Sequence, residues 1–71
     1  MREYTIQEAI TYLDSLIVSQ KEKGTNKLGL ELNIVGNDVA DYITKYYNNQ
    51  LIACTMKECV LRKVYEVIIW W

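Results

Sequence analysis

Histidine is absent from this 71-residue chain, and so are proline and phenylalanine. Without histidine the chain has neither the commonest general base nor the commonest metal ligand, and every histidine-dependent catalytic triad is excluded. The three glycines stand apart from one another, so there is no glycine-rich loop of the kind that binds phosphate. Because so small a chain also offers few groups that could be tuned to catalytic pKa values, we expect no enzymatic activity and no cofactor.

Long apolar runs and an excess of basic residues are missing as well. No apolar run approaches the roughly 20 residues of a membrane-spanning helix, and the N-terminal residues do not follow the pattern of a secretory signal. Eight basic against nine acidic residues give a net charge of −1, whereas phosphate binding needs lysines and arginines clustered on one face. We therefore expect a cytoplasmic protein that does not associate with membranes, and nucleic acid is the less favoured partner.

Cysteine is scarce, with Cys54 and Cys59 as its two occurrences. Their spacing matches neither a redox motif nor a zinc knuckle, and no histidine is available to complete a zinc site. We expect no metal site and two reduced thiols that behave as small hydrophobic side chains. If the surrounding segment is a hairpin, the two thiols could face each other across its turn and form a disulfide under oxidation.

What the chain does contain is the composition of one globular domain spanning residues 1–71. Hydrophobic residues make up 51% and charged residues 24% of the sequence. A chain near this size buries only about 60% of the surface that its unfolded form exposes, which leaves no room for a second core.

Periodic patterns predict two helices and an intervening strand. Thr5 followed by Glu8 has the spacing of a capping box and predicts a helix that begins at Ile6 and ends near Gly24. Residues 28–34 alternate apolar and polar side chains, which predicts a strand with one buried face. Asn37 or Asp38 could cap a second helix that stops near residues 48–49.

The C-terminal residues admit two interpretations. Residues 55–71 could form a helix, since Thr55 and Glu58 repeat the capping-box spacing. The β-branched and aromatic residues of the segment favour strands instead. We therefore expect a short strand at 51–54, a turn at 56–58 and a long strand at 60–70. The predicted fold is α+β with the order α-β-α-β-β, and two helices pack on one face of a three-stranded sheet.

Every aromatic ring in this sequence carries a polar group, because the chain has six tyrosines, two tryptophans and no phenylalanine. Tyrosine and tryptophan are enriched among the residues that dominate protein interfaces. As a strand, residues 64–71 would place Tyr65, Val67, Ile69 and Trp71 on one face, with Val64, Ile68 and Trp70 on the other. A single layer of helices can cover only the first of these faces, and an uncovered apolar face usually marks a contact surface.

We accordingly predict partner-binding residues at Tyr42, Tyr46, Ile68 and Trp70, and no catalytic residues. The expected function is that of a small protein–protein interaction module, such as a regulator, inhibitor or accessory subunit, that forms a homo-oligomer, with a dimer as the expected form. Its size and composition also fit small accessory proteins encoded by phages and mobile elements. The alternative is a small winged-helix-like DNA-binding transcriptional regulator whose recognition helix spans residues 55–63.

Overall fold

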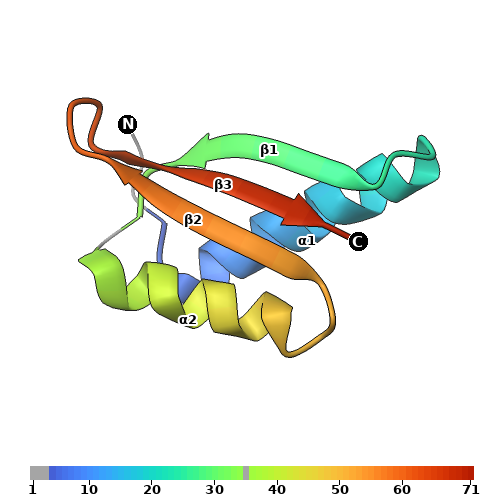
Figure 1. Cartoon of the computed structure of the whole chain (residues 1–71), viewed down its shortest axis with the longest axis horizontal. Helices are drawn as coiled ribbons and strands as arrows, with labels where there is room; N and C mark the ends of the chain where they lie inside the picture. Colours follow the sequence, from blue (N-terminus) through green and yellow to red (C-terminus); the bar gives the residue numbers. More distant parts are fainter. Residues whose placement is uncertain (1–3, 35) are drawn as a thin grey trace.

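The residues that the structure describes fold into two helices and three strands in the predicted order. The structure is a computed structural model that describes residues 4–34 and 36–71. Along the chain it contains α1 (Ile6–Glu22), β1 (Lys27–Leu32), α2 (Gly36–Asn48), β2 (Ala53–Cys59) and β3 (Val64–Trp70). Both helices lie on the same side of the sheet, so the predicted α+β arrangement is confirmed (Figure 1).

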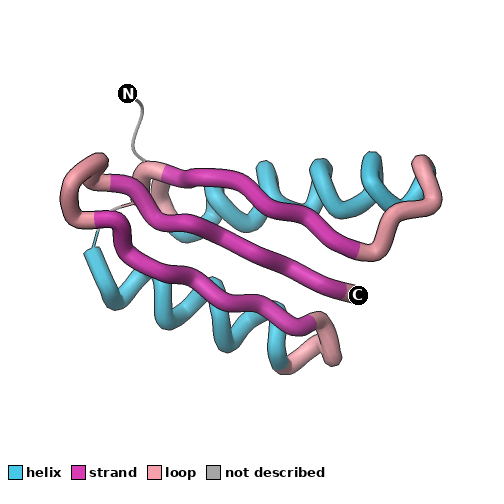
Figure 2. The backbone as a smooth tube through the Cα atoms, turned by 45° about the horizontal axis from the view of Figure 1, so that its top comes forward, coloured by secondary structure: helices cyan, strands magenta, loops and turns pink. Residues whose placement is uncertain are grey.

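The last strand, β3, occupies the centre of the sheet. The strand order is β1-β3-β2, and β3 runs antiparallel to both neighbours. Ile69 of β3 is paired with Leu28 of β1 and with Cys54 of β2. In Figure 2 the three strands lie in front of the two helices, and no helix of the described residues covers the opposite side of the sheet.

The first helix begins as the capping-box spacing predicts. The backbone N–H of Glu8 donates to Thr5 Oγ1 at 3.3 Å, and the backbone N–H of Thr5 donates to Glu8 Oε1 at 3.2 Å. These two bonds satisfy backbone donors that would otherwise lack a partner at the helix start. At the other end the chain leaves the helix through Gly24, whose φ of 80° is accessible to glycine without strain.

The second helix starts slightly earlier than the expected cap at Asn37 or Asp38. It begins at Gly36, and Asp38 lies within the first turn, where its negative charge complements the helix dipole. The helix ends at Asn48, close to the expected stop. The side chain of Asn48 then accepts a hydrogen bond of 3.0 Å from the backbone N–H of Cys54, which joins the helix end to the start of β2.

The hairpin between β2 and β3 lies further along the chain than the sequence indicated. The expected turn at 56–58 is wrong, because these residues continue β2, and so is the expected strand start at Val60. The reversal takes place at residues 60–63 between the pair Cys59 and Val64, with Lys63 in the left-handed region at φ 54°. The alternative helix over 55–71 does not form, since most of this segment pairs in the sheet.

The hydrophobic core lies between the helices and the sheet. Three residues of β3, namely Tyr65, Val67 and Ile69, point into it as the alternation predicts, and all three are buried. The helices contribute Ala9, Ile10, Leu13, Ile17, Ala40, Ile43 and Tyr47. Neither of the two described helices combines the length and the apolar character that a membrane crossing would require.

Candidate interaction surface

The sheet has one face that the helices do not cover, which we call the open face. Its position follows from the alternation of side chains along each strand and from the register between strands. Beside the hairpin, Cys59 and Val64 pair on this face, and β1 contributes no paired residue there. The remaining outward side chains are Lys27, Gly29 and Glu31 of β1, Ala53, Thr55 and Lys57 of β2, and Glu66, Ile68 and Trp70 of β3. They form three rows across the sheet, each with one residue from every strand.

Two of the three rows are centred on an apolar side chain. Trp70 is 38% exposed and Ile68 is partly exposed. The ammonium group of Lys27 lies 5.9 Å from the centre of the Trp70 ring, so the indole faces a cation. Val64, which the alternation placed on this same face, is buried. The apolar part of the open face is therefore narrower than predicted and consists of Ile68 and Trp70.

The third row is charged. Arg62, from the hairpin loop, contacts Glu31 Oε2 at 2.5 Å and Glu66 Oε1 at 3.1 Å, so it links a residue of β1 to a residue of β3. Lys57 is paired with Glu66 across the sheet in the strand register. Two basic and two acidic side chains thus lie together at this end of the open face, and their formal charges cancel.

Gly29 leaves a gap beside the apolar part of the open face. It is paired with Ile68, and a Cβ atom added to Gly29 would meet nothing within 4 Å. Glycine weakens a strand, and it commonly marks a bulge, a bend or a close approach of another molecule. The packing of the described residues therefore gives no reason for a glycine at this position.

The structure does not bring Tyr42 and Tyr46 together with Ile68 and Trp70. Both tyrosines belong to α2, on the opposite side of the sheet from the open face (Figure 2). Tyr42 is largely exposed, whereas Tyr46 is partly buried with its ring edge-on to Tyr47 at a centroid distance of 5.1 Å. A contact role for this tyrosine pair stays a prediction, and it would require a surface separate from the open face.

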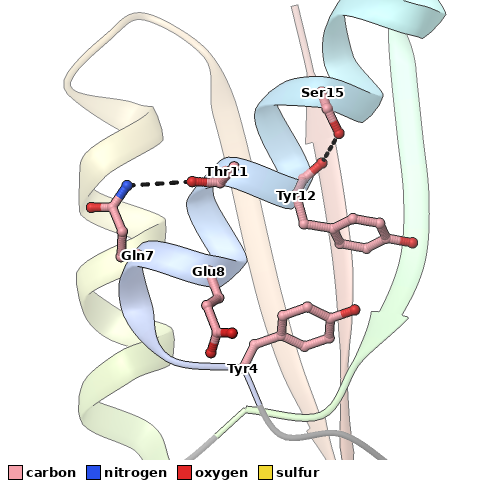
Figure 3. A pocket seen from close by; sticks show the side chains of 6 residues that line it. All are labelled: Tyr4, Gln7, Glu8, Thr11, Tyr12 and Ser15. Atoms are coloured by element: carbon pink, nitrogen blue, oxygen red, sulfur yellow. Dashed lines mark hydrogen bonds between the residues drawn. The ribbon is translucent and has the colours of Figure 1, made fainter.

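A shallow hollow of about 450 Å³ lies over the first half of α1 (Figure 3). The rings of Tyr4 and Tyr12 stack in it, with centroids 5.5 Å apart. Other polar groups around the hollow bond within the helix. Gln7 donates to Thr11 at 3.3 Å, and Ser15 donates to the carbonyl oxygen of Tyr12 at 2.7 Å. The hollow therefore provides a stacked aromatic surface, and its serine and threonine hydroxyls already take part in hydrogen bonds.

Tyr47 is the buried polar contact that sequence patterns missed. Small domains often carry tyrosine at the core boundary, and the helical periodicity of residues 6–22 places Asp14 on the polar side of that helix. Tyr47 is instead fully buried, and its hydroxyl donates to Asp14 Oδ1 at 2.7 Å. Burial, followed by the hydrogen bond to Asp14, raises the pKa of Tyr47 far above its ordinary value near 10. The hydrogen bond joins α1 to α2. The residue pattern within either helix gives no indication of this contact.

This raised pKa predicts a loss of stability at alkaline pH. Because the folded state holds the Tyr47 proton more tightly than the unfolded state, the stabilisation is complete below about pH 10 and falls above it. The free energy of unfolding should decrease by at most about 1.4 kcal/mol per pH unit from this residue. Urea denaturation between about pH 8 and about pH 11 measures the slope. An equally steep slope in a Tyr47→Phe variant would contradict the assignment.

The two cysteines differ in environment and do not face each other. Both lie on β2 and point to opposite faces, since they are five positions apart in one strand, so the disulfide proposed across the turn is wrong in its geometry. Burial raises the pKa of the Cys54 thiol to about 11. Arg62 Nε donates to the sulfur of Cys59 at 3.5 Å, and this contact lowers the pKa of Cys59.

The difference between the pKa values of the two thiols predicts that Cys59 is alkylated selectively. At neutral pH iodoacetamide should modify Cys59 at least about 100-fold faster than Cys54, because the thiolate is the reactive form. Peptide mass spectrometry over time gives the two rates. Replacing Arg62 by glutamine should slow the reaction of Cys59 and leave that of Cys54 unchanged. Comparable rates for the two cysteines in the folded protein would disprove this account.

The hairpin loop exposes two apolar residues that are not among the predicted partner-binding residues. Val60 and Leu61, in the loop between β2 and β3, are 73% and 96% exposed. The sequence pattern does not indicate that these side chains are exposed, because it predicts a strand from residue 60 onward. Their exposure becomes apparent only when the reversal is placed at residues 60–63.

Within residues 4–34 and 36–71, no three side chains of histidine, cysteine, aspartate or glutamate gather in a way that could hold a metal ion. Among the same residues, every buried side-chain nitrogen or oxygen atom has a hydrogen-bond partner.

No protein-family model matches the chain, and neither a curated protein nor a solved structure matches it.

Proposed function

We propose that this protein is a small non-enzymatic interaction module that binds another protein chain through its open face. The observation that carries the proposal is the position of Ile68 and Trp70. Both point away from the helices on the central strand of the sheet, where neighbouring strands flank them on each side. In this role the protein acts as a regulator, an inhibitor or an accessory subunit of its partner.

The side chains around this pair favour contact with a protein surface. Gly29 and Thr55 beside Ile68 are small, and so is Ala53 beside Trp70, whereas Lys27 on the other side of Trp70 holds its ammonium group 5.9 Å from the ring centre. A tryptophan that is open on its β2 side and faces a cation on its β1 side has the character of an interface hot spot, because a partner can pack against the indole. The charged row at the other end supplies the polar rim that protein interfaces usually have.

The DNA-binding alternative receives less support. A winged-helix protein needs a recognition helix, and residues 55–59 of the predicted helix form part of β2 instead. Of its basic residues, Arg62 contacts the carboxylates of Glu31 and Glu66, and Lys57 is the register partner of Glu66, so these carboxylates would oppose phosphate. Retention on a polyanion column that falls steeply with salt would favour DNA binding over the proposed function.

Photo-cross-linking tests the proposal directly. A benzoylphenylalanine placed at Thr55 projects from the open face, and the same group at Val18, which is 55% exposed on α1, serves as the control. In cells that naturally express the protein, irradiation should attach a second polypeptide at position 55 and not at position 18. Absence of any cross-link at position 55, or equal yields at both positions, would contradict the proposal.

A further inference from the structure

We propose that the partner on the open face is a second copy of this chain, bound face to face about a two-fold axis parallel to β3. The inference rests on the proposed function and names its partner. Such an axis places β1 of one copy over β2 of the other, while each β3 lies over its counterpart. The apolar rows of the two copies then meet, and so do the two charged rows.

Charge complementarity carries this arrangement. Glu31 of β1 and Lys57 of β2 lie on either side of Glu66 in the charged row, each in the strand next to β3. Glu31 already contacts Arg62 of its own copy through Oε2 at 2.5 Å. The axis parallel to β3 places this carboxylate of each copy opposite Lys57 of the other, which adds two ion pairs between the copies. The two Glu66 side chains approach each other near the axis, and each of them is already paired with Arg62 of its own copy at 3.1 Å.

The shapes of the apolar rows also match under the same axis. Gly29 of one copy lies opposite Thr55 of the other, so the missing side chain makes room for a larger one. Trp70 lies over its counterpart, and Ile68 does the same. An axis in the plane of the sheet, perpendicular to the strands and centred on the Ile68 row, would instead place Trp70 over Glu66 of the second copy, which would bury a carboxylate against an indole ring.

The size of the face predicts a weak, reversible dimer. Three strands spaced about 4.8 Å apart and about 23 Å long offer a face that would bury on the order of 1,000 Å² in total. This buried area is near the lower end for specific interfaces, so we expect a dissociation constant in the micromolar range or above.

Charge-swap variants test both the partner and the axis. In sedimentation equilibrium at low salt, wild-type protein should form dimers, and Glu31→Lys or Lys57→Glu alone should weaken association at least about 10-fold. Each single variant sets like charges opposite each other at two places. In an equimolar mixture of the two variants, the lysine introduced at position 31 faces the glutamate introduced at position 57, and the unchanged Lys57 faces the unchanged Glu31. The mixture should therefore associate again. Glu22→Lys, on α1, is the matched control and should dimerise like the wild type.

The possible outcomes separate this inference from the proposed function. A wild-type mass of one chain at every concentration, or a mixture that fails to associate, would overturn the two-fold dimer. If photo-cross-linking at position 55 then captured a different polypeptide, the proposed function would stand without the second copy. If Lys57→Glu alone left association intact, the axis parallel to β3 would be wrong.

Discussion

Replacing Ile69 by alanine is expected to lower the free energy of unfolding by about 3 kcal/mol. Ile69 is fully buried on the central strand, and it is paired with Leu28 on one side and with Cys54 on the other. A domain of 71 residues has a total stability of roughly 4–10 kcal/mol, so the loss would approach half of it. Urea denaturation followed by circular dichroism measures the change.

Val18→Ala is the control for this substitution. Val18 is an exposed aliphatic residue of α1, so its replacement should change the free energy of unfolding by no more than about 0.5 kcal/mol. If Ile69→Ala were as stable as Val18→Ala, the central strand could not be packed against the helices as described.

Replacing Trp70 by alanine should weaken self-association at least about 30-fold, which corresponds to a hot spot of about 2 kcal/mol. The side chain is partly exposed in the single chain and lies within the proposed contact, so much of its burial would occur only in the assembly. The dissociation constant from sedimentation equilibrium gives the effect, and circular dichroism shows that the variant keeps its fold.

Tyr12→Ala provides a matched aromatic control. Tyr12 and Trp70 are each 38% exposed, but Tyr12 belongs to α1 and lies away from the open face. Its replacement should leave the dissociation constant within about two-fold of the wild-type value. Equal losses for the two variants would indicate that aromatic exposure in general, and not the open face, drives association.

Much of the fold could be predicted because its signals are local. The capping box of Thr5 and Glu8 fixes the start of α1 through two bonds within one turn. The alternation along residues 64–70 places Tyr65, Val67 and Ile69 on the helix-covered face, and all three lie in the core as predicted, whereas Val64 on the other face is buried as well. Local periodicity therefore sufficed for the two helices and for the face that Ile68 and Trp70 occupy, and the β-branched and aromatic composition favoured strands over a helix in the C-terminal segment.

The remaining features depend on contacts between distant segments. Residues 60–63 have the sequence Val-Leu-Arg-Lys, without the glycine, asparagine or proline that usually marks a turn, so the hairpin position could not be read from composition. Its position follows from the register that pairs Cys59 with Val64. The hydrogen bond between Tyr47 and Asp14 likewise depends on two helices that are distant in the sequence. The separation of Tyr42 from Trp70 also becomes apparent only in three dimensions.

The measurement that tests the central claim most directly is the solution mass of a Gly29→Lys variant beside the wild type, by sedimentation equilibrium from about 1 µM to about 1 mM. A side chain at Gly29 meets open space within the chain, so the variant should keep its thermal unfolding midpoint. We predict that the wild-type mass rises from one chain towards two, while that of Gly29→Lys stays at one. A wild-type mass that never exceeds one chain, or equal association of both proteins, would contradict a dimer formed through the open face.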